Sequence, residues 1–199
     1  PFRIGKTSAK KVSYLYADSS LKALHIPSIN VDSLLIHPQR GKRYPDDTVS
    51  YRPLLAAQLK ALPTLLNIDS LYLTNSEVQY NEIGKKGREG FLRFTDINGS
   101  ITSIKNHHYD ANDSLRIRIQ AKVMGTGQLS LYYRQSYTDS LQSFLMTTHL
   151  GAFELKQMNS MAEPMGVRIK GGKIDSLDMR VRANDLFAYR VAVYPCLLR

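Results

Sequence analysis

The sequence predicts a mainly β protein, in which an antiparallel sheet carries one apolar and one polar face and is accompanied by two short helices. The tripeptide Asp-Ser-Leu occurs five times, beginning at residues 32, 69, 113, 139 and 175. Asp and Ser suit the end of a turn and Leu starts a buried run, so the repeat is typical of turns that lead into strands. Residues 115–123 alternate strictly between apolar and polar side chains, which is the period of a half-buried strand. A chain organised in this way is typical of a protein that works through an extended surface.

The N-terminal part predicts two strands and one helix. Residues 12–36 alternate in two apolar segments and predict two strands joined by a turn. After a polar loop that contains prolines, apolar residues at helical spacing predict a helix over residues 54–62. Pro53 suits the first turn of this helix and Pro63 ends it.

Strands dominate from Ile68 onwards. Residues 68–80 and 90–94 are expected to pair across a charged loop, and further strands are expected at 97–104, 115–123, 129–134 and 143–150. A second short helix is predicted over 155–162, because Pro164 and Gly166 follow it. A last hairpin is expected to join 167–170 to 174–183 through Gly171-Gly172, and a final strand covers 187–194. Nothing in the sequence is typical of a linker, so we expect one domain over residues 1–199.

The charge balance favours anionic partners. Lys and Arg number 27 against 17 Asp and Glu, a formal net charge of +10. Such an excess suits nucleic acid, acidic lipid head groups or lipopolysaccharide. The charges are spread along the chain, however, and the basic residues of 115–123 alternate with aliphatic rather than aromatic residues. This is unlike a surface on which bases stack, so the sequence predicts no nucleic-acid partner.

The sequence carries no pattern that predicts catalysis. There is no nucleophile elbow, phosphate-binding loop, dinucleotide fingerprint or zinc-protease motif. The lone Cys196 lies among apolar residues, which favours an inert thiol. His107, His108 and Asp110 form the only cluster that could suggest a metal, but adjacent histidines on a strand point to opposite faces. We therefore predict a protein that is not an enzyme and has no catalytic residue, metal ligand or cofactor. A metal site would require Asp110 beside His107 and a third ligand.

The predicted strands 115–123 and 174–183 supply two candidate surfaces. One is an apolar face, which could be either a groove or a closed core against the two helices. The other is a basic outer face. The apolar candidates are Leu115, Ile117, Ile119, Val123, Leu177, Met179 and Val181, and the basic candidates are Arg116, Arg118, Lys122, Arg180 and Arg182.

Two motifs stand near the C-terminus: Gly172-Lys173-Ile174-Asp175-Ser176-Leu177-Asp178-Met179 and Val191-Ala192-Val193-Tyr194. Together they resemble the closing repeat of AsmA-like proteins of Gram-negative envelopes. The chain departs from the family at Arg190, where glycine is common, and at Pro195-Cys196. Further segments that look like the family's recurring motifs are 51–55, 68–71, 78–82, 90–94, 97–99 and 124–127.

This resemblance implies a long, curled sheet with an apolar concave face, as in bridge-like lipid-transfer proteins. It implies a role in lipid transport or outer-membrane assembly, with phospholipid, lipopolysaccharide or envelope proteins as partners. It also implies a periplasmic location and a membrane-associated full-length protein tethered to the inner membrane. Because the chain starts at Pro1 without a signal-peptide pattern, we expect it to be an excerpt of a longer chain. The alternative is an interaction module that holds a partner protein or a polyanion through sheet edges and the basic face.

Overall fold

The computed structural model describes residues 2–41, 53–84, 87–184 and 188–196. Within these residues, one large sheet contains 13 strands, and two further short strands pair with each other. The helical elements are α1 (Leu55–Lys60), the 3-10 turn η1 (Leu155–Met158) and α2 (Asn159–Ala162), which confirms the mainly β fold with two short helices. The strands are β1 (Phe2–Arg3), β2 (Lys6–Lys10), β3 (Ser13–Ala17), β4 (Ser20–Asp32), β5 (Leu35–Ile36), β6 (Gln39–Gly41), β7 (Leu65–Ile83), β8 (Glu89–Lys105), β9 (Ser114–Val123), β10 (Gly127–Ser136), β11 (Phe144–Leu150), β12 (Phe153–Glu154), β13 (Lys173–Ile174), β14 (Ser176–Ala183) and β15 (Ala188–Cys196).

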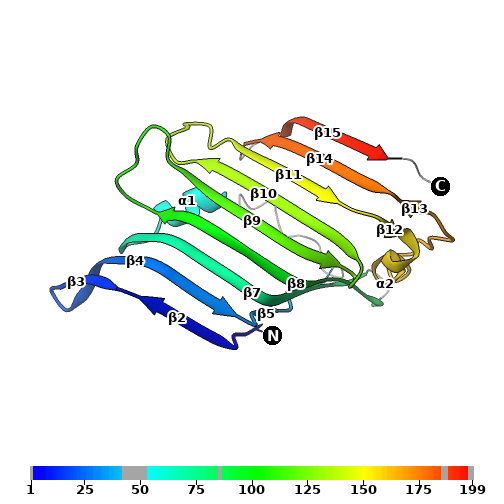
Figure 1. Cartoon of the computed structure of the whole chain (residues 1–199), viewed down its shortest axis with the longest axis horizontal. Coiled ribbons are helices and arrows are strands. Elements are labelled where there is room, and N and C mark those ends of the chain that lie inside the picture. The colour runs from blue at the N-terminus through cyan, green and yellow to red at the C-terminus, as the bar shows by residue number, and fades with distance from the viewer. Residues whose placement is uncertain (1, 42–52, 85–86, 185–187, 197–199) are drawn as a thin grey trace.

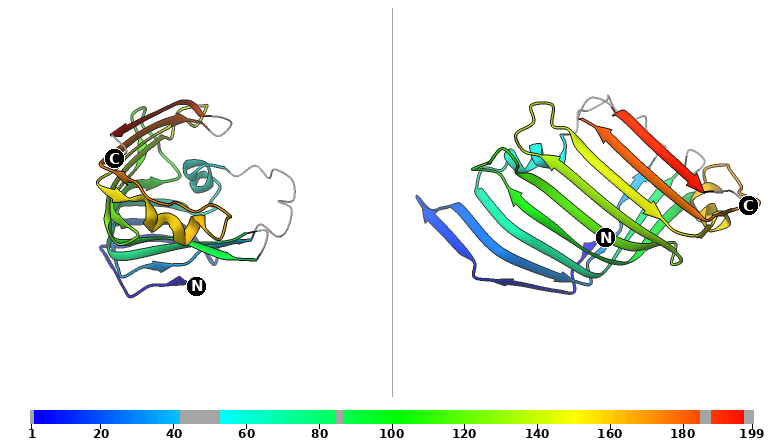
Figure 2. Two further views of the ribbon diagram at one scale, coloured as in Figure 1. Left: turned by 90° about the vertical axis from the view of Figure 1, so that its right-hand side faces the viewer. Right: turned by 45° about the horizontal axis from the view of Figure 1, so that its top comes forward.

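The large sheet is curled. From β7 it continues through β8, β9, β10, β11 and β14 to β15, and β4 lies on the other side of β7 (Figure 1). Seen along the strands, the sheet has a C-shaped cross-section with α1 on its concave side (Figure 2). We call the concave side the inner face and the convex side, which Figure 1 presents to the viewer, the outer face.

Alternation along β9 assigns side chains to the two faces. The antiparallel register with β10 places Ile117 opposite Tyr133 and Arg118 opposite Tyr132. Neighbours within a strand point to opposite sides of a sheet, so Ile117 belongs to the inner face and Arg118 to the outer face. The alternation predicted for residues 115–123 thus becomes the division between the two faces.

The sheet is mostly but not wholly antiparallel. Strands β4, β5 and β6 pair with β7 in parallel, with Ile29 opposite Leu71 and Leu35 opposite Glu77. Parallel neighbours require a connection that returns the chain to the same end of the sheet. The segment that contains α1 makes this connection between β6 and β7. The prediction of an antiparallel sheet is therefore wrong for this part.

Two predictions about individual strands are also wrong. Residues 97–104 do not form a separate strand, because β8 continues through Thr95–Asn98 with a register shift and Asp96 in a left-handed conformation (φ 52°). Residues 167–170 are not a strand. Asn159 bonds both the amide and the carbonyl of Ile169 and holds this segment against α2. Strand β14 instead pairs with β11 and β15. The predicted pairing of 68–80 with 90–94 is confirmed.

Candidate functional site: the apolar inner face

The centre of the inner face consists of two rows of side chains that run across the strands. Residues directly opposite each other in a sheet share a face, so the register defines each row. One row joins Leu71, Ile101, Ile117, Tyr133, Met146, Val181 and Val191, and the next joins Leu73, Gly99, Ile119, Leu131, Thr148, Met179 and Val193. We call these two rows the trough.

The structure brings the apolar candidates from β9 and β14 onto this one face. Ile117 and Val181 share the first row, and Ile119 and Met179 share the second. Leu177 lies one row further along, opposite Leu150 on β11. The remaining two candidates, Leu115 and Val123, occupy opposite ends of β9.

Most of the trough is half-buried, whereas both ends of β9 are buried. Ile117, Ile119, Met179 and Val181 are intermediate in exposure. Leu115 and Val123, in contrast, are 2% and 7% exposed. An ordinary closed core would bury its centre most completely, but here the burial is greatest at the ends. Within the described residues, this pattern favours a groove over a closed core.

Helix α1 covers one end of the trough. Ala56 of this helix packs with Leu115 and Tyr137 in a buried cluster, which Leu59 and Ile101 extend. The Nζ of Lys60 donates a hydrogen bond to the carbonyl of Tyr137 at 2.6 Å. The six residues of α1 are good helix formers, but a helix this short is marginal in water, so tertiary contacts of this kind must hold it in place.

The segment around η1 and α2 covers the other end. Phe153 is 3% exposed and lies so close to Gly127 that a Cβ there would come within 2.6 Å of the Phe153 ring. Gly90 of β8 accommodates the backbone of Met161 in the same way, at 2.9 Å from a Cβ built on the glycine. A side chain at Gly127 would displace Phe153 of β12, and one at Gly90 would push α2 off the sheet.

Buried polar groups gather at the α1 end. Gln135 is fully buried, and its Oε1 accepts hydrogen bonds from the amide of Ala56 at 3.1 Å and the hydroxyl of Tyr133 at 2.9 Å. The hydroxyl of Tyr137 donates to the carbonyl of Ser103, and its ring stacks on Tyr109 at 4.8 Å. Burial raises the pKa of Tyr133 and that of Tyr137 to about 12, because the phenolate is disfavoured away from water.

One polar atom in the trough has no partner. The hydroxyl of Thr148 is buried between Leu131 and Met179 and makes no hydrogen bond in the described part of the chain. No titratable side chain but Tyr133 lies in the two rows, so the trough offers apolar contact rather than acid–base chemistry.

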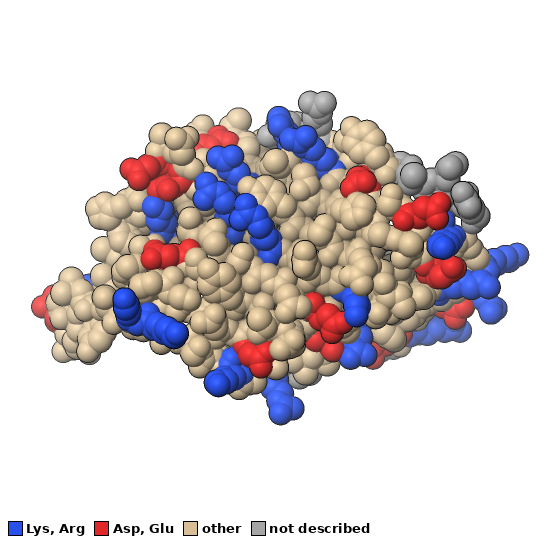
Figure 3. Space-filling view, viewed as in Figure 1, with Lys and Arg blue, Asp and Glu red and all other residues tan. Residues whose placement is uncertain are grey.

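The basic candidates lie on the outer face. Arg118 and Arg180 share one row, and Arg116 and Arg182 share the next row, in which Arg134 of β10 also lies. Lys122 is different, because its Nζ pairs with Asp96 at 2.8 Å. Lys and Arg are crowded over the upper strands on this face (Figure 3).

Several residues of the two faces were not among the sequence candidates. Leu131, Tyr133 and Met146 belong to the trough, and Arg134 and Tyr132 belong to the outer face. Consecutive tyrosines and consecutive threonines obscure the alternation of β10 and β11, so only the register with β9 reveals these positions.

The described residues contain no group of three or more His, Cys, Asp or Glu side chains that could hold a metal ion. The rings of His107 and His108 meet edge to face at 5.0 Å. The side chain of Cys196 lies outside the described part of the structure.

No helix in the described residues is long and apolar enough to cross a bilayer. No protein-family model, curated protein or solved structure matches the chain.

Proposed function

We propose that this chain is a non-enzymatic, AsmA-like segment that guides lipid acyl chains along its trough and so contributes to lipid transport or outer-membrane assembly in a bacterial envelope. The observation that carries the proposal is the half-buried centre of the trough between two buried ends. The sequence motifs shared with AsmA-like proteins support the same function. A periplasmic location and a tether to the inner membrane, supplied outside this chain, belong to the same proposal.

The energetics of the trough are adequate for a weak lipid site. Each 100 Å² of acyl chain that leaves water contributes about 2.5 kcal/mol. Ile117 and Ile119 of β9, Leu131 of β10 and Met179 of β14 present apolar side chains across the trough, and only Thr148 of β11 lies between Leu131 and Met179. A lipid can therefore bind by contact alone and still leave, which suits a protein that passes lipids on.

Uptake of a fluorescent phosphatidylethanolamine by the purified chain tests the proposal. Ile119→Glu places a charge in the trough and should abolish uptake. The matched control is Gln120→Glu, which adds the same charge to the outer face one residue further along β9 and should leave uptake unchanged. Met179→Gln adds polarity without charge and should weaken uptake in a protein that still folds.

Native mass spectrometry after mild extraction should also detect bound phospholipid. A chain that never takes up the labelled lipid, or a control that loses uptake as fully as Ile119→Glu, would contradict the proposal. Circular dichroism of each variant establishes that the sheet is intact.

A further inference from the structure

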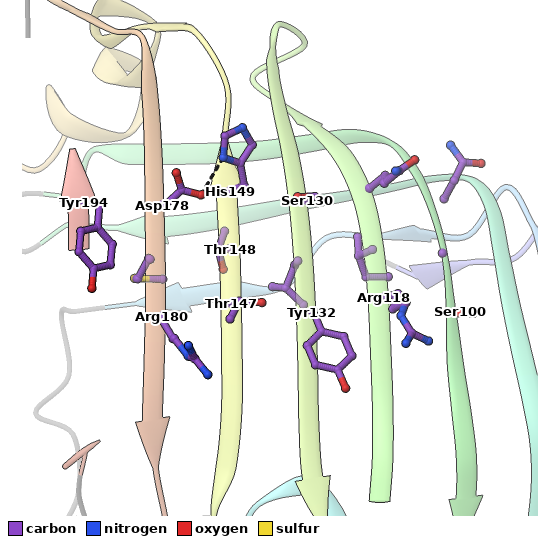
Figure 4. A pocket seen from close by; sticks show the side chains of 16 residues that line it. Ser100, Arg118, Ser130, Tyr132, Thr147, Thr148, His149, Asp178, Arg180 and Tyr194 are labelled. Atoms are coloured by element: carbon purple, nitrogen blue, oxygen red, sulfur yellow. Dashed lines mark hydrogen bonds and ion pairs between the residues drawn. The ribbon is translucent and has the colours of Figure 1, made fainter. Parts of the chain in front are cut away.

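The outer face contains a furrow that the lipid proposal does not use. It has a volume of about 670 Å³ and is lined by residues of β8, β9, β10, β11, β14 and β15. Five spacings between neighbouring strands make it roughly 24 Å long. Its walls are two outer-face rows, represented by Arg118, Tyr132 and Arg180 on one side and by His149 and Tyr194 on the other (Figure 4).

The furrow has a surplus of positive charge. The guanidinium groups of Arg118 and Arg180 are exposed and form no ion pair with any described carboxylate. The neighbouring row adds the exposed side chains of Arg134 and Arg182. Asp178 is the acidic residue in the lining of the furrow, and its Oδ1 lies 2.8 Å from Nδ1 of His149. Unpaired arginines in a recess are an arrangement that favours an anionic ligand.

The neutral lining indicates which anion fits. Three neutral side chains of the furrow make no hydrogen bond within the described residues: Ser130, Thr147 and Gln120. Their hydroxyl and amide groups can therefore both donate hydrogen bonds to a ligand and accept them from it. Tyr194 is 65% exposed, and Arg118 lies over the ring of Tyr132 at 5.2 Å. Sugar rings present hydroxyl groups that both donate and accept, together with an apolar face that packs on an aromatic ring.

Other polyanions suit the furrow less well. A nucleic-acid strand needs free aromatic faces for successive bases, but the Tyr132 ring already has Arg118 over it. A bilayer surface needs apolar side chains that project from the protein, whereas the furrow is recessed between polar rows.

We propose that the furrow binds an extended anionic oligosaccharide, with its acidic groups on Arg118 and Arg180 and a sugar ring on Tyr194. Fluorescence anisotropy of a fluorescein-labelled oligogalacturonate tests this with the whole chain. The proposal goes beyond lipid guidance, and lipid uptake through the trough should be unchanged in every furrow variant.

The double variant Arg118→Gln/Arg180→Gln should weaken oligogalacturonate binding by about ten-fold or more at low salt and flatten its salt dependence. The matched control, Lys10→Gln/Lys22→Gln, removes the same charge from exposed residues of β2 and β4 and should change binding less than about two-fold. Tyr194→Ala should weaken binding several-fold and keep the salt dependence, because it removes a contact without charge.

The competing ligands are labelled maltohexaose, oligothymidylate and phosphatidylglycerol vesicles. Weaker binding of all three than of oligogalacturonate supports the proposal. Absence of oligogalacturonate binding at low salt, an equal loss in the lysine control, or tighter arginine-dependent binding of oligothymidylate or vesicles would overturn it.

Discussion

The side-chain oxygen of Gln135 accepts a hydrogen bond from the backbone amide of Ala56, 3.1 Å away and 79 residues earlier in the chain. This bond joins the first turn of α1 to the inner face of β10. It matters because the helix has no side-chain cap of its own. The same oxygen also accepts the Tyr133 hydroxyl, so one buried amide fixes both a helix and the end of the trough.

Replacing this amide should loosen α1. Gln135→Ala leaves the Tyr133 hydroxyl and an amide of α1 without partners in a buried site, and we expect it to lower the free energy of unfolding by about 2–3 kcal/mol. The control is Gln120→Ala on the outer face, which should change it by less than about 0.5 kcal/mol. Urea unfolding measures both. Equal effects would show that Gln135 does not hold the helix.

Removing the unpartnered hydroxyl of the trough should stabilise the protein. Thr148→Val keeps the shape of the side chain and replaces a buried, unsatisfied oxygen by a methyl group, so we expect a gain of about 1 kcal/mol. Thr147→Val, one residue earlier and on the outer face, should give a much smaller change. Thermal unfolding of the two variants under identical conditions tests this, and a loss of stability in Thr148→Val would contradict it.

Alkaline pH should weaken the fold through its buried tyrosines. Tyr137 has a pKa of about 12 in the folded protein against an ordinary value of 10, so the unfolded chain loses this proton first as the pH rises. The contribution of the protonated Tyr137 side chain to the free energy of unfolding is complete below pH 10. It falls by about 1.4 kcal/mol per pH unit towards pH 12. Tyr137→Phe removes the hydroxyl that donates to the carbonyl of Ser103 and accepts from the amide of Lys105, so the variant should be less stable at neutral pH. Because phenylalanine does not titrate, the variant should also lose stability less steeply between pH 10 and pH 12. Denaturant unfolding across this range measures the slope, and an unchanged slope in the variant would refute the prediction.

Gly99 should tolerate no side chain. A Cβ at this position would overlap the carbonyl oxygen of Arg118 and lie 2.8 Å from Cδ1 of Ile119, because β8 and β9 approach closely beside the β8 bulge. Gly99→Ala should cost about 1–3 kcal/mol. Gly41→Ala is the control, since no described residue has an atom within 4 Å of a Cβ built there. Chemical denaturation distinguishes the two, and similar midpoints would contradict the close approach.

The sequence identified the faces of the sheet where alternation was undisturbed. Residues 115–123 alternate without exception, so the inner position of Ile117 and the outer position of Arg118 followed directly. The Asp-Ser-Leu repeat was less reliable. It begins strands at Ser114 and Ser176, but at residues 69–71 it lies inside β7, where Asp69 pairs with His25 of the neighbouring strand at 3.2 Å. A turn residue can therefore sit within a strand when an exposed partner satisfies it.

The rest of the site depended on pairing that no local pattern encodes. Tyr132 and Tyr133 are both aromatic, and only the register with Arg118 and Ile117 assigns one to the furrow and the other to the trough. Arg180, which forms no ion pair with a described carboxylate, and Lys122, whose ammonium pairs with Asp96, look alike in the sequence. Their difference arises from the bulge in β8 that brings Asp96 to Lys122.

The parallel pairing of β4 with β7 has a consequence for the order in which the chain folds. Strands β8 to β11 are sequential antiparallel neighbours, so each pairing closes only a short loop. Ile29 can meet Leu71 only after a much longer loop has closed, which costs more entropy before any contact forms. We therefore expect the β8–β11 meander to fold first, and the N-terminal strands to pair with the sheet afterwards. Amide exchange should then be slowest in β9 and β10, and it should be faster in β4.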